Sequence, residues 1–163
     1  MILKPTFYYH SISDIDIAKL VSSGVQHALI DIDNTLVSWD TALPNQSALA
    51  FIEALSQNHI KVCLVSNNNQ ERVELFARNL NLPYIYKAKK PLPINFRKGM
   101  QLVGGHWRST VIIGDQIFTD VLGSKLAKIR SVLVDPIGQK EFAWTMFVRK
   151  IENFIRKNLV YTK

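Results

Sequence analysis

The stretch Gln26-His27-Ala28-Leu29-Ile30-Asp31-Ile32-Asp33-Asn34-Thr35 decides the fold, because a short apolar run ends in two closely spaced acids. The run His27–Ile30 predicts a buried strand. An Asp-x-Asp pair directly after such a strand places two carboxylates at the rim of a sheet, where their repulsion requires a cation or a proton. Taken alone, the pair is equally compatible with a solvated turn in which each Asp binds its own backbone. The rest of the chain decides between these interpretations.

Strand-like and helix-like patterns alternate along the chain. The expected strands are His27–Ile30, Lys61–Val65, Tyr84–Tyr86, Thr110–Ile113 and Ser131–Val134. The helical patterns between them are Asn45–Gln57, Gln70–Leu80, Pro93–Val103 and Phe118–Ala127. This alternation predicts an α/β fold with three layers, in which a five-stranded, Rossmann-like parallel sheet carries helices on both faces.

Two further helices are expected at the ends of the chain. The first covers Ser11–Ser22, with Ser13 as its N-cap. The second is amphipathic and covers about residues 140–159. Its expected apolar face carries Trp144, Phe147, Val148, Ile151, Phe154 and Ile155, and its basic side carries Arg149, Lys150, Arg156 and Lys157. No repeat or linker divides the sequence, so residues 1–163 are expected to form a single domain.

The composition indicates a cytoplasmic protein with an anionic partner. The net charge of +7 suits nucleic acid, anionic lipid or a phosphorylated substrate, although a basic solvated surface would also account for it. The single cysteine, Cys63, lies in an apolar run, which excludes a disulfide or a thiolate metal site within the chain. No apolar run reaches the roughly 18 residues of a membrane span, and residues 1–10 do not resemble a signal peptide.

Unusual polar residues follow four of the expected strands. In an open parallel sheet, functional groups collect at the carboxyl ends of the strands. The four groups are Asp31 with Asp33, Ser66-Asn67-Asn68-Asn69, Lys87-Ala88-Lys89-Lys90-Pro91, and Gly114-Asp115 followed by Asp120. Each group alone could be a helix cap or a solvated loop. All four together would require four separate coincidences, which favours a shared site.

This set of side chains suits phosphoryl transfer. Asp31 and Asp115 can share Mg²⁺, a cation that prefers oxygen ligands and neutralises phosphate oxygens. Asp31 can attack phosphorus to form an aspartyl-phosphate intermediate. Asp33 can protonate the leaving oxygen and later deprotonate the attacking water. The Ser66 hydroxyl, nearby backbone amides and the Lys90 ammonium can stabilise the phosphoryl group during transfer.

The chain resembles the haloacid dehalogenase (HAD) superfamily of phosphatases, subfamily IIIA, in four ordered motifs. These are Asp31-Ile32-Asp33-Asn34-Thr35, Ser66 after Val62-Cys63-Leu64-Val65, Lys90 before Pro91, and Gly114-Asp115 with Asp120. The resemblance implies that Asp31 is the nucleophile and Asp33 the acid/base. It also implies that Mg²⁺ is bound by Asp31, Asp115 and the backbone carbonyl of Asp33.

The remaining polar residues of the motifs have supporting roles in this interpretation. Asn67 is expected to bind the substrate phosphate beside Ser66, and Asp120 to hold a metal-bound water or to orient the lysine. Lys89 competes with Lys90 for the lysine role. Lys90 is preferred because the family's lysine is often followed by proline.

Further segments resemble the YqeG branch of the superfamily, whose relatives include phosphatidylglycerophosphate phosphatases. They are residues 11–16, Leu36-Val37-Ser38-Trp39-Asp40, Ser66-Asn67-Asn68-Asn69 and Ala88-Lys89-Lys90-Pro91. This resemblance implies phosphatidylglycerophosphate as the substrate. The alternatives are a nucleic-acid 3′-phosphate or a small phosphorylated metabolite. A receiver-type signalling domain or a silent phosphate-binding module fits less well, because the acid/base position Asp33 and every motif residue are present.

The spacing of the motifs predicts that the domain has no cap. The gaps from Asp31 to Ser66 and from Ser66 to Lys90 are too short for an inserted domain. The site should therefore be open to a phosphate carried on a lipid, a nucleic-acid end or a protein, while a small substrate would need a lid from a neighbouring subunit. The apolar face of the terminal helix is expected to pack on the sheet, as is usual for such helices, rather than to enter a membrane. In that arrangement its basic outer side can still lie against anionic lipid on the inner face of a membrane. Nucleic acid is not favoured, because no nucleic-acid-binding motif is recognised.

Overall fold

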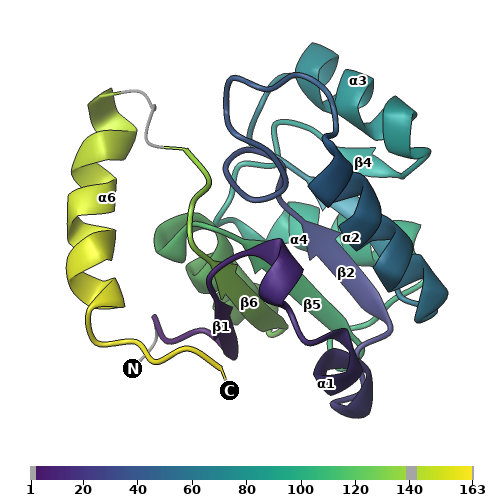
Figure 1. Cartoon of the computed structure of the whole chain (residues 1–163), viewed down its shortest axis with the longest axis horizontal. Helices are drawn as coiled ribbons and strands as arrows, with labels where there is room; N and C mark the ends of the chain where they lie inside the picture. The colour runs from purple at the N-terminus through teal and green to yellow at the C-terminus, as the bar shows by residue number, and fades with distance from the viewer. Residues whose placement is uncertain (1–2, 139–142, 163) are drawn as a thin grey trace.

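A six-stranded parallel sheet forms the centre of the structure, a computed structural model that describes residues 3–138 and 143–162 (Figure 1). The strands run in the order β1-β6-β5-β2-β3-β4. Their bounds are β1 Phe7–Tyr9, β2 His27–Ile30, β3 Lys61–Val65, β4 Tyr84–Ile85, β5 Thr110–Gly114 and β6 Arg130–Val134. The helices are η1 Ile12–Asp14, α1 Ile17–Ser22, α2 Gln46–Gln57, α3 Gln70–Leu80, α4 Pro93–Leu102, η2 Ile117–Val121, α5 Leu122–Ala127 and α6 Ala143–Arg156. The predicted α/β fold is confirmed.

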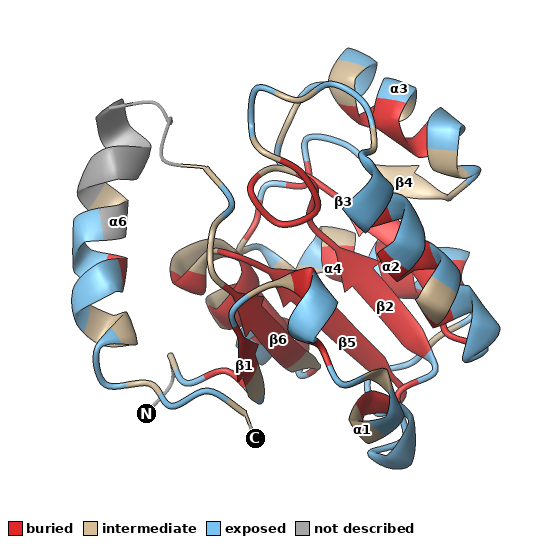
Figure 2. Ribbon diagram, viewed as in Figure 1, coloured by how far each residue is buried: buried red, intermediate tan, exposed pale blue. Residues whose placement is uncertain are grey.

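The sheet is buried on both faces, as parallel sheets require (Figure 2). Successive side chains of β2 point to opposite faces of the sheet and enter two different cores. Ala28 and Ile30 belong to the core beneath α2 and α3, whereas Leu29 packs with α4 and α5 on the other face. The helices therefore form two outer layers, and the central strands β2, β3 and β5 lie buried between them.

The predicted strand count of five is wrong, because β1 adds a sixth strand at one edge. It pairs with β6 in the register Phe7↔Val132. Three residues are too few to show a strand periodicity, which explains the omission. On the other side of β1, Tyr8 N donates to Thr162 Oγ1 at 2.9 Å, and Thr162 N donates to Tyr8 O at 2.7 Å. The C-terminal tail thus lies along the outer edge of β1.

The helix expected over Ser11–Ser22 is broken into η1 and α1. The N-cap of α1 is Asp16, whose carboxylate accepts a hydrogen bond from Lys19 N at 2.9 Å. Ser13, the expected cap, instead lies within η1, and its hydroxyl contacts that of Ser47. Ile15 between the two helices is extended and buried, so packing of this side chain interrupts the helix.

The terminal helix α6 lies beside the β1 and β6 end of the sheet (Figure 1). Its expected first residues, 140–142, and the side chains of Trp144, Phe147 and Arg149 lie outside the described residues. The expected faces of the helix are wrong in part. Phe154 is 70% exposed and Ile151 43% exposed, whereas Arg156 turns inward. No helix in the described residues is long and apolar enough to cross a membrane.

Candidate active site

The carboxyl ends of four strands meet around a cavity of about 260 Å³. The pairing explains the convergence, because Ile30 at the end of β2 lies beside Leu64 of β3 and Ile113 of β5. The cavity is lined by Asp31, Asp33, Asn34, Trp39, Ser66, Asn67, Asn68, Lys90, Gln116 and Thr119. Residues from the loops after four different strands, up to 88 positions apart in the chain, therefore surround one space.

Three buried acids cluster at the cavity, and one of them, Asp31, lines it. Asp31, Asp115 and Asp120 each offer a carboxylate oxygen, and these oxygens lie within 4.8 Å of one another. Thr35, at the end of the first motif, donates a hydrogen bond to Asp115 Oδ1 at 3.2 Å. Carboxylates this close repel strongly away from water. The cluster therefore requires positive charge.

Lys90 supplies part of that charge. Its Nζ lies 2.8 Å from Asp31 Oδ1 and 2.8 Å from Asp120 Oδ1, and the lysine side chain is only 2% exposed. Lys89, its competitor in the sequence, is exposed. One ammonium beside three ionised carboxylates leaves a net charge of −2. A hard divalent cation with oxygen ligands would neutralise this remainder, so the residues fit a divalent metal site.

The pKa values of the cluster reflect the same balance. Burial raises the pKa of the Asp31 carboxyl well above its ordinary value; Lys90 opposes that rise, and Asp120 and Asp115 add to it. Burial alone would lower the pKa of the Lys90 ammonium, but Asp120 and Asp31 outweigh it and raise that pKa. The lysine therefore stays charged, while an ionised Asp31 is costly unless another cation is bound.

Gly114 is required by the position of Asp120. A Cβ atom at Gly114 would come within 2.3 Å of the Asp120 carboxyl carbon, closer than any tolerated contact. Asp120 Oδ2 accepts a hydrogen bond from Gln116 N at 3.1 Å, while Oδ1 binds Lys90. Asp120 is thus fixed against the end of β5, where it holds Lys90 in place.

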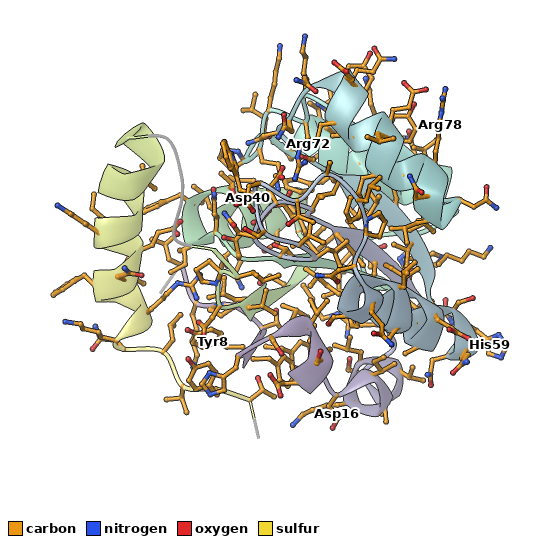
Figure 3. The ribbon with its side chains drawn as sticks, turned by 45° about the horizontal axis from the view of Figure 1, so that its top comes forward. Tyr8, Asp16, Asp40, His59, Arg72 and Arg78 are labelled. Carbon is orange, nitrogen blue, oxygen red and sulfur yellow. The ribbon has the colours of Figure 1, made fainter. Side chains whose placement is uncertain are left out.

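Asp33 lies apart from the acid cluster and has its own partners. Arg72 Nε donates to Asp33 Oδ1 at 2.8 Å, and Asn68 Nδ2 donates to Oδ2 at 3.2 Å. Figure 3 shows Arg72 on the end of α3 that faces these loops, whereas Arg78 of the same helix lies away from them. The sequence predicted no role for Arg72. A cation in the first turn of a helix carries no signal of a pairing 39 residues away.

The loop after β3 connects two predicted site residues. Ser66 is buried, and its Oγ accepts a hydrogen bond from Asn68 N at 3.1 Å and donates to Asp33 Oδ2 at 3.5 Å. Asn67 accepts a hydrogen bond from Lys90 N at 2.7 Å through its side-chain oxygen. This hydrogen bond links the loop after β3 to the loop that carries Lys90. The sequence did not indicate this contact.

The arrangement separates two carboxylates chemically. Asp31 is buried in an anionic cluster that calls for a metal and lies at the floor of the cavity. Asp33 is more exposed and is oriented by Arg72 and Asn68 at the cavity wall. A nucleophile and a proton carrier need such different surroundings, because one must attack beside a cation and the other must reach water.

Comparisons with known proteins identify the family of the chain and the proteins that share its fold. The sequence profile of the haloacid dehalogenase-like hydrolases matches residues 9–128. The probable phosphatase YqeG of Bacillus subtilis strain 168 is 36% identical over 151 residues, which cover 93% of this chain and 88% of that protein. Two solved structures share the fold at 15% identity. A HAD-superfamily hydrolase from Ehrlichia chaffeensis has a TM-score of 0.56 and covers 83% of this chain and 98% of its own. The cobalt-bound deoxy-D-mannose-octulosonate 8-phosphate phosphatase from Haemophilus influenzae has a TM-score of 0.55 and covers 85% and 90%.

Proposed function

The chain belongs to the haloacid dehalogenase-like hydrolase family, and we propose that it is a Mg²⁺-dependent phosphomonoester hydrolase. The observation that carries the proposal is a cluster of three buried acids around Lys90, beside a further carboxylate, Asp33, that is held by Arg72. The similarity to a probable phosphatase over nearly the whole chain supports the same reaction class.

The reaction follows from the two carboxylates. An Asp31 oxygen attacks phosphorus, the bond from phosphorus to the ester oxygen breaks, and Asp33 donates a proton to that leaving oxygen. A water molecule then attacks the phosphorus of the aspartyl phosphate, and Asp33 takes the proton of that water. Inorganic phosphate leaves and the Asp31 carboxylate is restored. Ser66 and Lys90 stabilise the phosphoryl oxygens during both transfers.

The side chains of Asp31 and Asp115 and the backbone carbonyl of Asp33 would hold the magnesium ion. When bound, the ion neutralises negative charge on the phosphate and on the acid cluster. Asp120 does not have to be a ligand, because its carboxylate already binds Lys90 and Gln116 N.

The first prediction concerns the metal. Hydrolysis of an aryl phosphate by the full chain should fall by at least about 100-fold in EDTA and return when excess Mg²⁺ is added, since the metal carries several kcal/mol of charge stabilisation. Circular dichroism in EDTA serves as the control that the protein is still folded. Undiminished turnover in EDTA would exclude the metal-dependent mechanism, and no turnover under any condition would favour a phosphate-binding or receiver-type module.

For the substrate we propose phosphatidylglycerophosphate. One helix, α2, separates β2 from β3, and one helix, α3, separates β3 from β4, so neither connection in the described chain holds an inserted cap. The site is then open to a phosphate on a large carrier. Trp39 is 38% exposed at the cavity wall, where it offers an apolar surface to the group that carries the phosphate. The resemblance to the YqeG branch, whose relatives include phosphatidylglycerophosphate phosphatases, supports the same choice.

A substrate panel tests this choice. Phosphatidylglycerophosphate in mixed micelles should give a kcat/KM at least about tenfold above that of sugar phosphates and 3′-phosphorylated oligonucleotides, equivalent to about 1.4 kcal/mol of transition-state binding. Micelles without substrate, added to the soluble substrates, control for a detergent effect. A preference for the oligonucleotide or for a sugar phosphate would replace the lipid with that alternative.

Peripheral contact with an anionic membrane is proposed through the outer face of α6. This face exposes Phe154 and Ile151 beside the exposed cation Lys150, and the exposed Lys157 follows directly after the helix. Such a mixture is typical of interfacial helices. Elsewhere, residues 75–134 contain only two acids, Asp115 and Asp120, and both are buried. The exposed charge of that long stretch is therefore entirely positive, which suits an anionic surface.

Vesicle binding should accordingly depend on lipid charge, on salt and on α6. We expect binding to phosphatidylglycerol vesicles to exceed binding to phosphatidylcholine vesicles and to weaken as the salt concentration rises. Phe154→Ser should reduce the partition coefficient by about tenfold, since a buried aromatic side chain contributes about 1.5–3 kcal/mol. Leu49→Ser, at an exposed leucine on α2, is the matched control. Equal binding to both kinds of vesicle would exclude an electrostatic membrane contact.

A further inference from the structure

The helix α6 reaches the loop that carries two of the clustered acids and binds it at two backbone groups. Phe118 N donates a hydrogen bond to Glu152 Oε1 at 2.8 Å. Arg156 Nη2 donates to the carbonyl oxygen of Asp115. Glu152 and Arg156 lie four residues apart and therefore share one face of α6. The contacts fall within the segment 115–120, whose first and last residues supply carboxylates to the site.

Both side chains are held in place by burial or by further partners. Glu152 is only 1% exposed, an unusual position for a carboxylate on a terminal helix. Arg156 Nη1 also donates to Asp135 Oδ1 at 3.1 Å and to Tyr8 OH at 3.2 Å. Asp135 in turn accepts a hydrogen bond from Tyr8 OH at 2.6 Å. The guanidinium is thus fixed between the ends of β1 and β6 on one side and the Asp115 carbonyl on the other.

The loop itself needs such support. After Asp115 the backbone forms η2, a π-helical turn at Ile117–Val121, before it continues as α5. A π-turn departs from regular helical hydrogen bonding and is frequently found at functional sites. A helix that only packed on the sheet would need apolar side chains here. Instead, the Glu152 carboxylate of α6 binds the Phe118 amide within the turn, and the Arg156 guanidinium binds the Asp115 carbonyl just before it. These contacts orient the backbone that carries Asp115 and Asp120.

We infer that Glu152 and Arg156 are positioning residues for the metal site, acting through the backbone of the segment 115–120. The inference rests on the proposed function. Partners one step removed from a metal ligand set its orientation, and their loss typically reduces metal affinity or activity by about 10- to 100-fold. The same contacts make the docking of α6 a condition for an assembled active site.

The test measures metal binding and catalysis separately in the full chain. Mn²⁺ affinity by electron paramagnetic resonance, and kcat and KM for an aryl phosphate, are compared in wild type, Glu152→Ala, Glu152→Gln, Arg156→Ala and Arg156→Lys. We expect both alanine variants to bind Mn²⁺ about tenfold more weakly and to lose about tenfold in kcat with little change in KM. Glu152→Gln retains an acceptor for Phe118 N and should recover most of the loss. Asn153→Ala, at an exposed position of the same helix next to Glu152, is the control and should match wild type.

The outcomes separate this inference from the proposed function. Wild type that neither binds Mn²⁺ nor turns over would contradict the proposed function itself. Active wild type together with alanine variants of normal Mn²⁺ affinity and kcat would overturn the positioning role, even if their melting temperatures fall. If the alanine variants do not fold, Arg156→Lys decides the matter. It keeps the charge beside Asp135 but loses the second nitrogen that reaches the Asp115 carbonyl, so an unchanged Mn²⁺ affinity would overturn the inference.

Discussion

Asp31→Asn should lower Mg²⁺-dependent phosphatase turnover by at least about 10³-fold, the equivalent of about 4 kcal/mol of activation free energy, because the amide cannot attack phosphorus. The substitution is nearly isosteric and leaves the Lys90 pairing with Asp120 in place. The loss of activity should therefore occur in a folded protein. Residual turnover within about tenfold of wild type would reject Asp31 as the nucleophile.

The pH dependence of the melting temperature is an independent test of the same variant. Because burial raises the pKa of Asp31 above its ordinary value of 3.8, the metal-free folded state holds that proton more tightly than the unfolded chain. The stabilisation is present below pH 3.8 and is lost as the pH rises through the folded-state pKa. Asp31→Asn has no such titration. In EDTA the melting temperature of Asp31→Asn should therefore rise relative to that of wild type as the pH increases. A difference that stays constant with pH would contradict the raised pKa of Asp31.

Lys90→Met should have the second large effect, on stability as well as on activity. Removal of one partner from a buried ion pair costs about 3–5 kcal/mol, because the remaining charges stay buried without compensation. In a chain of this size such a loss lowers the melting temperature by on the order of 10 °C. Turnover should fall by about 100-fold or more, since the charge that stabilises the transferring phosphoryl group is lost.

Magnesium and a neighbouring lysine provide the controls for that variant. Saturating Mg²⁺ should restore part of the lost stability by neutralising the acid cluster, while kcat stays low. Lys89→Met removes an equal charge from an exposed position one residue away and should leave both properties near wild type. Similar losses in the two variants would show that general charge, rather than the contacts of Lys90 with Asp31 and Asp120, explains the effect.

The central strands and the acid cluster could be predicted from the sequence, because they depend on local patterns. The expected strands at His27–Ile30 and Lys61–Val65 and the expected helix at Gln70–Leu80 have the bounds seen in the structure. Asp31 and Asp115 follow buried strands, and parallel strands place all such ends at one edge of a sheet. The convergence of these acids therefore requires only the order of the elements.

The residues that support the site could not be predicted in this way. Arg72, Glu152 and Arg156 lie on helices, and their site partners are 34 to 41 positions away along the chain. Such contacts depend on how each helix is placed on the sheet, which a hydrophobic periodicity does not define. On α6, the side that faces the sheet differs from the expected apolar side. Arg156 points inward, where it binds the 115–120 loop, and Phe154 points outward.

The tail that lies along β1 has a consequence for association between molecules. An edge strand normally presents unpaired amide and carbonyl groups that can recruit a strand from another chain and begin aggregation. Here the Thr162 backbone and hydroxyl occupy both main-chain groups of Tyr8. At the opposite edge, β4 has only two residues, too short a template for stable pairing. Both edge strands are thus protected against the addition of a strand from another molecule: β1 is covered by the C-terminal tail, and β4 is too short to pair stably.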